Sequence, residues 1–178
     1  KEIHEQPKAI QDTLNSVIHE NKIDLAEVGL EEEQIRDVSQ IYIVACGSAY
    51  HVGVAAQYVI EDLARIPVRV ELASEFRYRK PILDPNGLVI IISQSGETAD
   101  SLAALREAKS KGIRTLAIVN VVGSSIAREA DNVFYTLAGP EISVATTKAY
   151  STQLIAAYCL AVQFALVREE ITEEYYTE

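Results

Sequence analysis

The stretch that most constrains the fold is Leu88–Thr98, with the sequence LVIIISQSGET. Its first part, Leu88–Ile92, is entirely apolar, which favours a strand buried on both faces of a parallel sheet over a half-exposed antiparallel strand. The residues that follow are polar, and Leu102 and Leu105 then recur at helical spacing. The stretch therefore predicts a strand, a tight turn rich in hydroxyls and the start of a helix.

The turn Ser93–Thr98 carries three hydroxyl side chains. Unpaired N–H groups and the macrodipole make a helix N-terminus a suitable place for an anion, and Gly96 lets a ligand approach the backbone closely. The alternative is that these hydroxyls only cap the helix, a role worth about 1 kcal/mol. Glu97 and Asp100 favour that alternative, because their charges would repel an anion. The turn thus indicates a candidate binding site and leaves simple capping open.

Four other segments have the composition of strands, and helical patterns separate them. The predicted strands are Ile41–Ala45, Val68–Leu72, Leu88–Ile92, Thr115–Asn120 and Asn132–Leu137. This alternation favours an α/β three-layer sandwich with a five-stranded parallel sheet, and right-handed crossovers leave few strand orders. We expect the flavodoxin-like order 2-1-3-4-5, whose crevice opens between the first and third strands at their carboxyl ends. The turns Cys46–Ala49 and Ser93–Thr98 are predicted to meet there.

The chain divides into a lead-in, one central domain and a short tail. Residues 1–37 form the lead-in, with a helical stripe over Pro7–Glu20. Residues 38–170 hold the strand and helix repeats, and their length suits one α/β domain. Residues 171–178 are acidic and predicted to be a tail or linker. The chain begins with Lys1 and contains no methionine, so we expect a piece of a longer protein.

The net charge of −10 disfavours nucleic acid as a partner. No cluster of lysine or arginine lies near Ser93–Thr98, so an anion bound there would be held mainly by N–H and O–H dipoles. Arg77 and Arg79 could assist, although surface ion pairing is the commoner role of such residues. The apolar stretch Leu154–Val167 is shorter than the roughly 18 residues of a membrane span, and it predicts a buried helix and no membrane partner.

The two cysteines, Cys46 and Cys159, lie far apart in apolar contexts. With no signal peptide visible, we expect a reducing, cytoplasmic compartment, no disulfide, no metal site and no cofactor. The sequence lacks the Walker A loop, the GxGxxG fingerprint and the GxSxG elbow, which disfavours nucleotide-binding proteins and serine hydrolases. Cys46 and His51 could form a thiol nucleophile, but a small residue packed under the turn is the commoner interpretation.

Several stretches resemble the glutamine–fructose-6-phosphate aminotransferases, also called glucosamine-6-phosphate synthases. SQSGET at Ser93–Thr98 marks the wider sugar isomerase (SIS) fold. ASEFRYRKP at Ala73–Pro81 and SVATTKAY at Ser143–Tyr150 narrow the resemblance to this family. ACGSAYH at Ala45–His51 and NVVGSS at Asn120–Ser125 are also similar. The resemblance covers essentially the whole chain and implies the first of the two SIS halves of the family's isomerase region.

The resemblance implies a binding site for fructose 6-phosphate or glucosamine 6-phosphate. In the family, the SQS turn with the following threonine and the CGTS turn contact the phosphate, and a later loop lines the sugar. The matching residues are Ser93, Gln94, Ser95 and Thr98, then Gly47, Ser48 and Ala49, then Val144, Ala145 and Thr146. Ala49 stands where serine is usual, so one hydroxyl contact is lost. Thr146 also replaces a serine but keeps the hydroxyl.

The resemblance further implies that this stretch binds the sugar phosphate without converting it. Opening the sugar ring, forming an imine and moving a proton between C1 and C2 fall to the second SIS half and a C-terminal segment, and a glutaminase domain supplies ammonia. These parts lie outside the chain, so we expect no catalytic residue in it. The implied role is amino-sugar biosynthesis, with homodimerisation through the long helix Lys148–Glu169.

Two other functions are compatible with an SIS domain. A regulatory module would sense a sugar phosphate in the same crevice and would carry a DNA-binding or partner segment, which is not visible in the sequence. A stand-alone sugar-phosphate isomerase would need its own base, for which Glu141 and Lys148 are the candidates near the crevice. The stretches Ala73–Pro81 and Ser143–Tyr150 favour the aminotransferase family over both.

Overall fold

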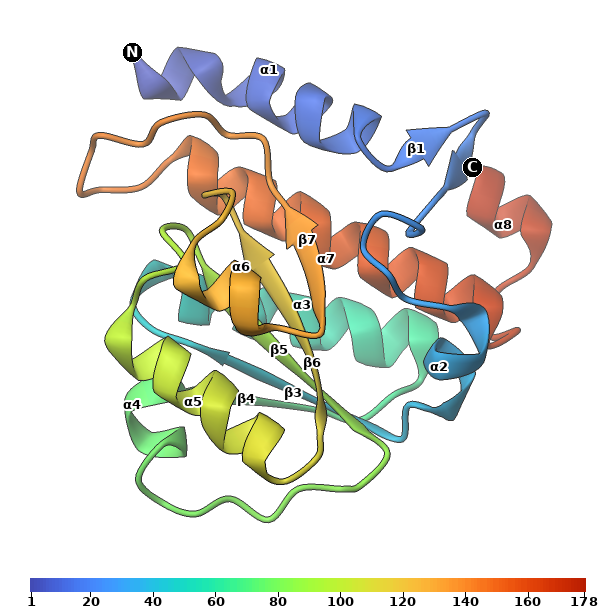
Figure 1. The fold of residues 1–178 in the computed structure, drawn as a ribbon. Coiled ribbons are helices and arrows are strands. Elements are labelled where there is room, and N and C mark those ends of the chain that lie inside the picture. Colours follow the sequence, from blue (N-terminus) through green and yellow to red (C-terminus); the bar gives the residue numbers. More distant parts are fainter.

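The computed structural model describes residues 1–178 and is built around a five-stranded parallel sheet (Figure 1). Its strands are β3 (Gln40–Ala45), β4 (Val68–Leu72), β5 (Gly87–Ser93), β6 (Arg114–Val119) and β7 (Asn132–Tyr135). Their order across the sheet is β4-β3-β5-β6-β7. Counted among these strands alone, the order is 2-1-3-4-5, so the prediction is confirmed.

Helices cover both faces of the sheet and complete the three layers. One face carries α3 (Ser48–Ala64) and α7 (Lys148–Val167), and the other carries α4 (Ala73–Phe76), α5 (Ala99–Ser110) and α6 (Ser125–Glu129) (Figure 1). Two further helices, α1 (Glu2–Asn15) and α2 (Glu32–Asp37), pack against α7. In Figure 1, α1 runs along the outer side of α7.

The strands are apolar throughout because both of their faces are buried. Ile41 and Ile43 belong to the hydrophobic cluster under α3 and α7, whereas Tyr42 and Val44 belong to the cluster under α5. Successive side chains of a strand point to opposite faces, so each strand supplies both clusters. This explains the unbroken apolar runs that predicted the strands.

Helix α7 is the central helix of the larger cluster. By length and composition alone it could cross a membrane. Twelve of its 20 residues are buried within the protein, among them Leu160 and Phe164. Most of its apolar surface is therefore covered by α1, α3 and the sheet, and Leu154–Val167 forms a largely buried helix, as predicted.

The sequence pattern predicts a helix over Pro7–Glu20. The N-terminal helix instead begins at Glu2 and ends at Asn15. Pro7 lies inside α1 and cannot donate an N–H to the carbonyl of Ile3. The Gln6 Nε2 donates to that carbonyl oxygen at 3.3 Å, which compensates for the missing bond. The segment 1–37 also contributes to the core of the sheet, with Val17, Leu25, Val28, Leu30 and Ile35.

Two short elements not predicted from the sequence pack against each other. They are a hairpin of β1 (Ile18–His19) and β2 (Lys22–Ile23), and the helix α8 (Glu173–Thr177). The Tyr176 hydroxyl accepts a hydrogen bond from the Ile23 N–H at 2.5 Å and donates to Gln163 Oε1 at 3.0 Å. The segment 171–178 is thus anchored to the hairpin and to α7.

Candidate functional site

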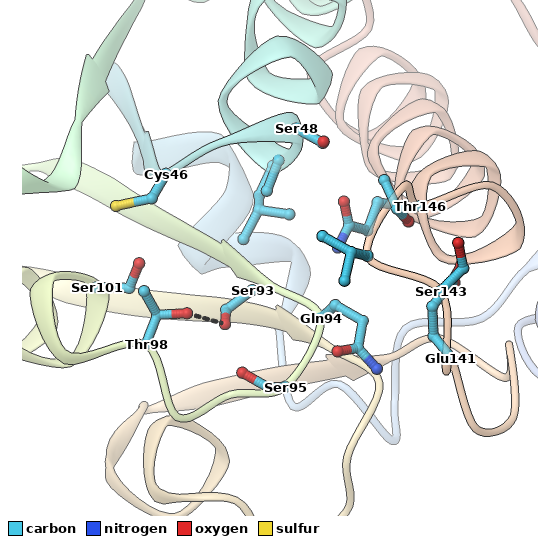
Figure 2. A pocket seen from close by; sticks show the side chains of 14 residues that line it. Cys46, Ser48, Ser93, Gln94, Ser95, Thr98, Ser101, Glu141, Ser143 and Thr146 are labelled. Carbon is cyan, nitrogen blue, oxygen red and sulfur yellow. Dashed lines mark hydrogen bonds between the residues drawn. The ribbon is translucent and has the colours of Figure 1, made fainter.

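Two polar turns lie at the carboxyl ends of β3 and β5, where the strand order reverses. Ala45 in β3 pairs with Ile92 in β5, so the chain leaves both strands at the same level. A cavity of about 280 Å³ opens between the turns (Figure 2). Eight of the predicted site residues line it: Ser48, Ala49, Ser93, Gln94, Ser95, Thr98, Val144 and Thr146. Gly47 and Ala145 do not belong to the lining.

Two helices begin at this cavity without a side-chain cap. The N-cap of α3 is Gly47, at φ +59°, and the N-cap of α5 is Thr98, whose side chain makes no capping hydrogen bond. The N–H groups of Ser48 and Ala49 in α3, and of Thr98 itself, have no acceptor within the chain. The uncapped amides and the N-terminal ends of two helix dipoles make this end of the cavity attractive to an anion.

The Thr98 hydroxyl bonds to a neighbouring hydroxyl and not to the helix backbone. Thr98 Oγ1 lies 3.1 Å from Ser93 Oγ, which also accepts the Gly96 N–H at 3.1 Å. Ser95 Oγ accepts the Glu97 N–H at 3.2 Å. Each hydroxyl oxygen is fixed by a local contact, while the Ser95 proton and one proton of the Ser93–Thr98 pair remain available to a ligand. The interpretation of the turn as a simple helix cap is therefore not supported.

The two acidic residues beside the turn are each bound to another group. Glu97 Oε1 accepts the Ser125 N–H at 2.8 Å, and hydrogen bonds from the Ser125 side chain and backbone lower the pKa of Glu97. The Asp100 carboxylate accepts a hydrogen bond from Arg77 Nη1 at 2.9 Å, and this bond raises the pKa of Arg77. Neither carboxylate lines the cavity. These contacts reduce the repulsion between the two carboxylates and an anion. The charges of Glu97 and Asp100 therefore argue less strongly against an anion site than they do in the sequence alone.

Arg77 and Arg79 do not supply a direct contact to the cavity. Arg77 pairs with Asp100 and Arg79 with Glu71, and no lysine or arginine lines the cavity. The side chains and backbone groups that could hold an anion there are hydroxyls and amides. Cys46 lies at the edge of the cavity, but it makes no hydrogen bond with the exposed His51.

A third helix, α7, also begins at the cavity, but its N-terminus is closed. The Glu141 carboxylate accepts the N–H of Thr147 at 3.1 Å and of Ala149 at 2.8 Å. Lys148, the other candidate base, is buried and pairs with Glu5 through Nζ and Oε2 at 2.6 Å. Lys148 does not line the cavity. Both candidate bases are thus engaged in structural contacts.

Three polar residues of the cavity were not predicted from the sequence, namely Ser101, Ser143 and Gln153. Ser101 is buried in the first turn of α5, and its hydroxyl has no partner in the chain. It follows Thr98 by three residues, so helical spacing places the two on the same side of α5. That spacing was a usable signal. Gln153 gave none, because it lies inside the long apolar pattern of α7.

The loop Asn120–Ser125 supports the turn after β5 from behind. The Asn120 N–H donates to the Gln94 carbonyl at 3.1 Å, and the Ile126 N–H donates to the Gly96 carbonyl at 3.0 Å. Gly96 has φ +68°, and Ser124 packs directly against its Cα. A side chain at Gly96 would collide with Ser124, so the close approach of the two loops requires glycine.

Two bacterial proteins of the same kind are similar to this chain over nearly its whole length. The chain is 60% identical over 98% of its length to the glutamine–fructose-6-phosphate aminotransferase (isomerizing) of Clostridium tetani, and 61% identical over 93% of its length to that of Caldanaerobacter subterraneus. It spans only 29% and 28% of those two proteins.

A solved structure is similar over nearly the whole chain. It is the C-terminal domain of glucosamine-fructose-6-phosphate aminotransferase from Francisella tularensis, with a TM-score of 0.94 and 40% sequence identity. The similarity covers 99% of this chain and 49% of that one. The SIS domain family matches residues 34–163, which include the whole sheet and the cavity. The chain therefore belongs to the SIS domain family.

Proposed function

We propose that the chain is the sugar-phosphate-binding half of the isomerase region of a glutamine–fructose-6-phosphate aminotransferase, an enzyme of amino-sugar biosynthesis towards UDP-N-acetylglucosamine. One observation carries the proposal: two uncapped helix N-termini and a set of hydroxyls converge on one cavity that contains no cationic side chain. The identity to aminotransferases of this kind extends over almost the whole chain. The ligand we assign is fructose 6-phosphate or glucosamine 6-phosphate.

The proposed ligand has its phosphate at the N-termini of α3 and α5. The free N–H groups of Ser48 and Thr98 lie there, together with the hydroxyls of Ser95 and Thr98. The sugar then extends towards the loop before α7, where Gln94, Thr146 and Ser143 offer hydrogen-bonding groups (Figure 2). The carboxylate that caps α7 makes that side of the cavity unfavourable for the phosphate.

In this proposal the chain binds the sugar phosphate but does not convert it by itself. Isomerisation requires a group that can take up and release a proton. Of the candidates, Glu141 accepts two backbone hydrogen bonds and Lys148 is paired with Glu5 outside the cavity. We assign the catalytic groups, and the supply of ammonia, to the remaining length of the relatives, of which this chain spans about 29%.

The proposed partners are the glutaminase domain, the second SIS half and a second copy of the protein. Tyr58 on α3 and Tyr158 on α7 are exposed. We propose that these outer surfaces take part in a homodimer contact through α7. Cys46 and Cys159 are both free thiols, which fits a cytoplasmic location. A sugar-phosphate-sensing module is the less favoured alternative, because 60% identity links the chain to aminotransferases.

Fructose 6-phosphate is expected to raise the unfolding temperature of the chain, whereas fructose is not. At a concentration 100-fold above Kd, the gain is about 2.7 kcal/mol, equivalent to roughly 5–10 °C for a domain of this size. Differential scanning calorimetry measures the shift. Ser95→Ala should shrink it, whereas Ser110→Ala, at the far end of α5, should not. Equal shifts with fructose and fructose 6-phosphate would contradict an anion site.

Replacing Arg77 with methionine is expected to weaken fructose 6-phosphate binding roughly two- to fivefold. The substitution leaves Asp100 without its counter-ion in the first turn of α5, close to the proposed phosphate. Isothermal titration calorimetry measures the affinity, and adding Asp100→Asn should restore it. Arg79→Met is the matched control, because its partner Glu71 lies in β4 and not in the first turn of α5. Equal losses in both arginine variants would attribute the effect to net charge alone.

A further inference from the structure

The segment Ala138–Thr147, which we call the rim loop, forms one side of the cavity without regular secondary structure. It follows β7 and precedes α7, and its residue Val144, which lines the cavity, is fully exposed. A loop of this kind holds one conformation only where other elements bind its backbone. The contacts that fix the rim loop therefore decide the shape of the sugar side of the cavity.

Helix α1 binds the backbone of the rim loop and of the residue before it. Glu2 Oε1 accepts the N–H of Ile142 at 2.8 Å and of Ser143 at 3.2 Å. Thr13, fully buried in the last turn of α1, accepts the Leu137 N–H at 3.0 Å through Oγ1. Figure 1 shows the loop running beside the N-terminal part of α1. These bonds link a segment at the start of the chain to one more than 100 residues later.

Helix α1 is itself held firmly to the start of α7. Glu5 pairs with Lys148, whose side chain is only 5% exposed, and Gln6 Oε1 accepts the Ser151 hydroxyl at 2.6 Å. A lysine in the first turn of a helix opposes the macrodipole, so the Glu5 carboxylate compensates an otherwise unfavourable buried charge. Helix α1, the rim loop and α7 approach one another closely through three small residues, Ala9, Ala138 and Ala149.

We infer that α1 is a positioning element of the binding site, and that Glu2 holds the rim loop in the conformation that receives the sugar. The assignment of a sugar rests on the proposed function. The phosphate end of the cavity is built by α3 and α5, and no hydrogen bond joins α1 to the turns Cys46–Ala49 or Ser93–Thr98. Glu2 therefore acts on sugar binding and leaves the two turns at the phosphate end of the cavity unchanged.

The test compares Glu2→Ala with the wild type in two independent measurements. Amide hydrogen exchange, followed by NMR, should become faster at Ile142 and Ser143, because both N–H groups lose their acceptor. The affinity for fructose 6-phosphate should fall roughly three- to tenfold, because the competent loop conformation is less populated. The affinity for inorganic phosphate should not change. Glu2→Gln should recover much of the loss, since an amide oxygen also accepts these bonds.

Lys8→Ala is the control on the same helix, because Lys8 pairs only with Asp12 on the exposed side of α1. Unchanged exchange at Ile142 and Ser143 in Glu2→Ala would overturn the inference. So would faster exchange with an unchanged affinity for fructose 6-phosphate, or an equal loss of phosphate affinity. If the wild type binds no sugar phosphate but exchange still accelerates in Glu2→Ala, the anchoring of the loop is supported and the proposed function is overturned.

Discussion

The Thr98→Asp variant is expected to bind fructose 6-phosphate at least about 100-fold more weakly than the wild type while unfolding at the same or a higher temperature. Thr98 is the N-cap of α5, and its hydroxyl does not cap the helix. An aspartate there accepts the free N–H groups and complements the helix dipole, a gain of about 0.5–1 kcal/mol. The same carboxylate lies where we place the phosphate, and such like-charge contacts cost several kcal/mol.

The opposite signs of the two effects separate an anion site from an ordinary helix cap. Calorimetry gives both quantities, as the unfolding temperature without ligand and the affinity for fructose 6-phosphate. The matched control is Thr172→Asp, because Thr172 is the N-cap of α8, accepts the Tyr175 N–H and does not line the cavity. The control should leave the affinity unchanged. Wild-type affinity in Thr98→Asp would show that the start of α5 does not hold the phosphate.

The sheet could be predicted from the sequence because its signal is local. The apolar runs Ile41–Ala45 and Leu88–Ile92 are too continuous for a half-exposed strand, and the handedness rule for parallel crossovers then restricts the strand order. The N-terminal region lacked such a signal. The strands β1 and β2 have two residues each, below any periodic pattern, and α1 begins at Glu2, whose carboxylate is bound by the distant rim loop.

The position of the candidate site could also be predicted, because it depends on where neighbouring strands end. Its electrostatics could not be predicted. Glu97 and Asp100 appeared unfavourable, and their partners Ser125 and Arg77 come from other elements, 28 and 23 residues away. The role of Glu141 as the cap of α7 likewise depends on the path of the rim loop. Residue types and spacing located the turns, and only the tertiary contacts showed which N–H groups stay free.

Replacing Gly96 with alanine is expected to destabilise the chain by roughly 2–5 kcal/mol and to lower its affinity for fructose 6-phosphate. Gly96 has φ +68°, where an L-residue costs about 1–2 kcal/mol. An added Cβ would also lie 2.0 Å from Ser124 Oγ and 2.6 Å from Ser124 Cβ, and such overpacking costs about 1–3 kcal/mol. Relief of this clash must move the loop Asn120–Ser125 or the turn that holds the anion.

Gly112→Ala separates the two causes, because Gly112 has φ +73° but nothing lies within 4 Å of its added Cβ. Chemical denaturation should give a loss of about 1–2 kcal/mol for Gly112→Ala, with ligand affinity unchanged. Adding Ser124→Gly to Gly96→Ala should recover part of the stability and of the binding, because the atoms that collide are removed. If Gly96→Ala loses no more stability than Gly112→Ala, the contact with Ser124 does not shape the turn, and the affinity should then be unaffected as well.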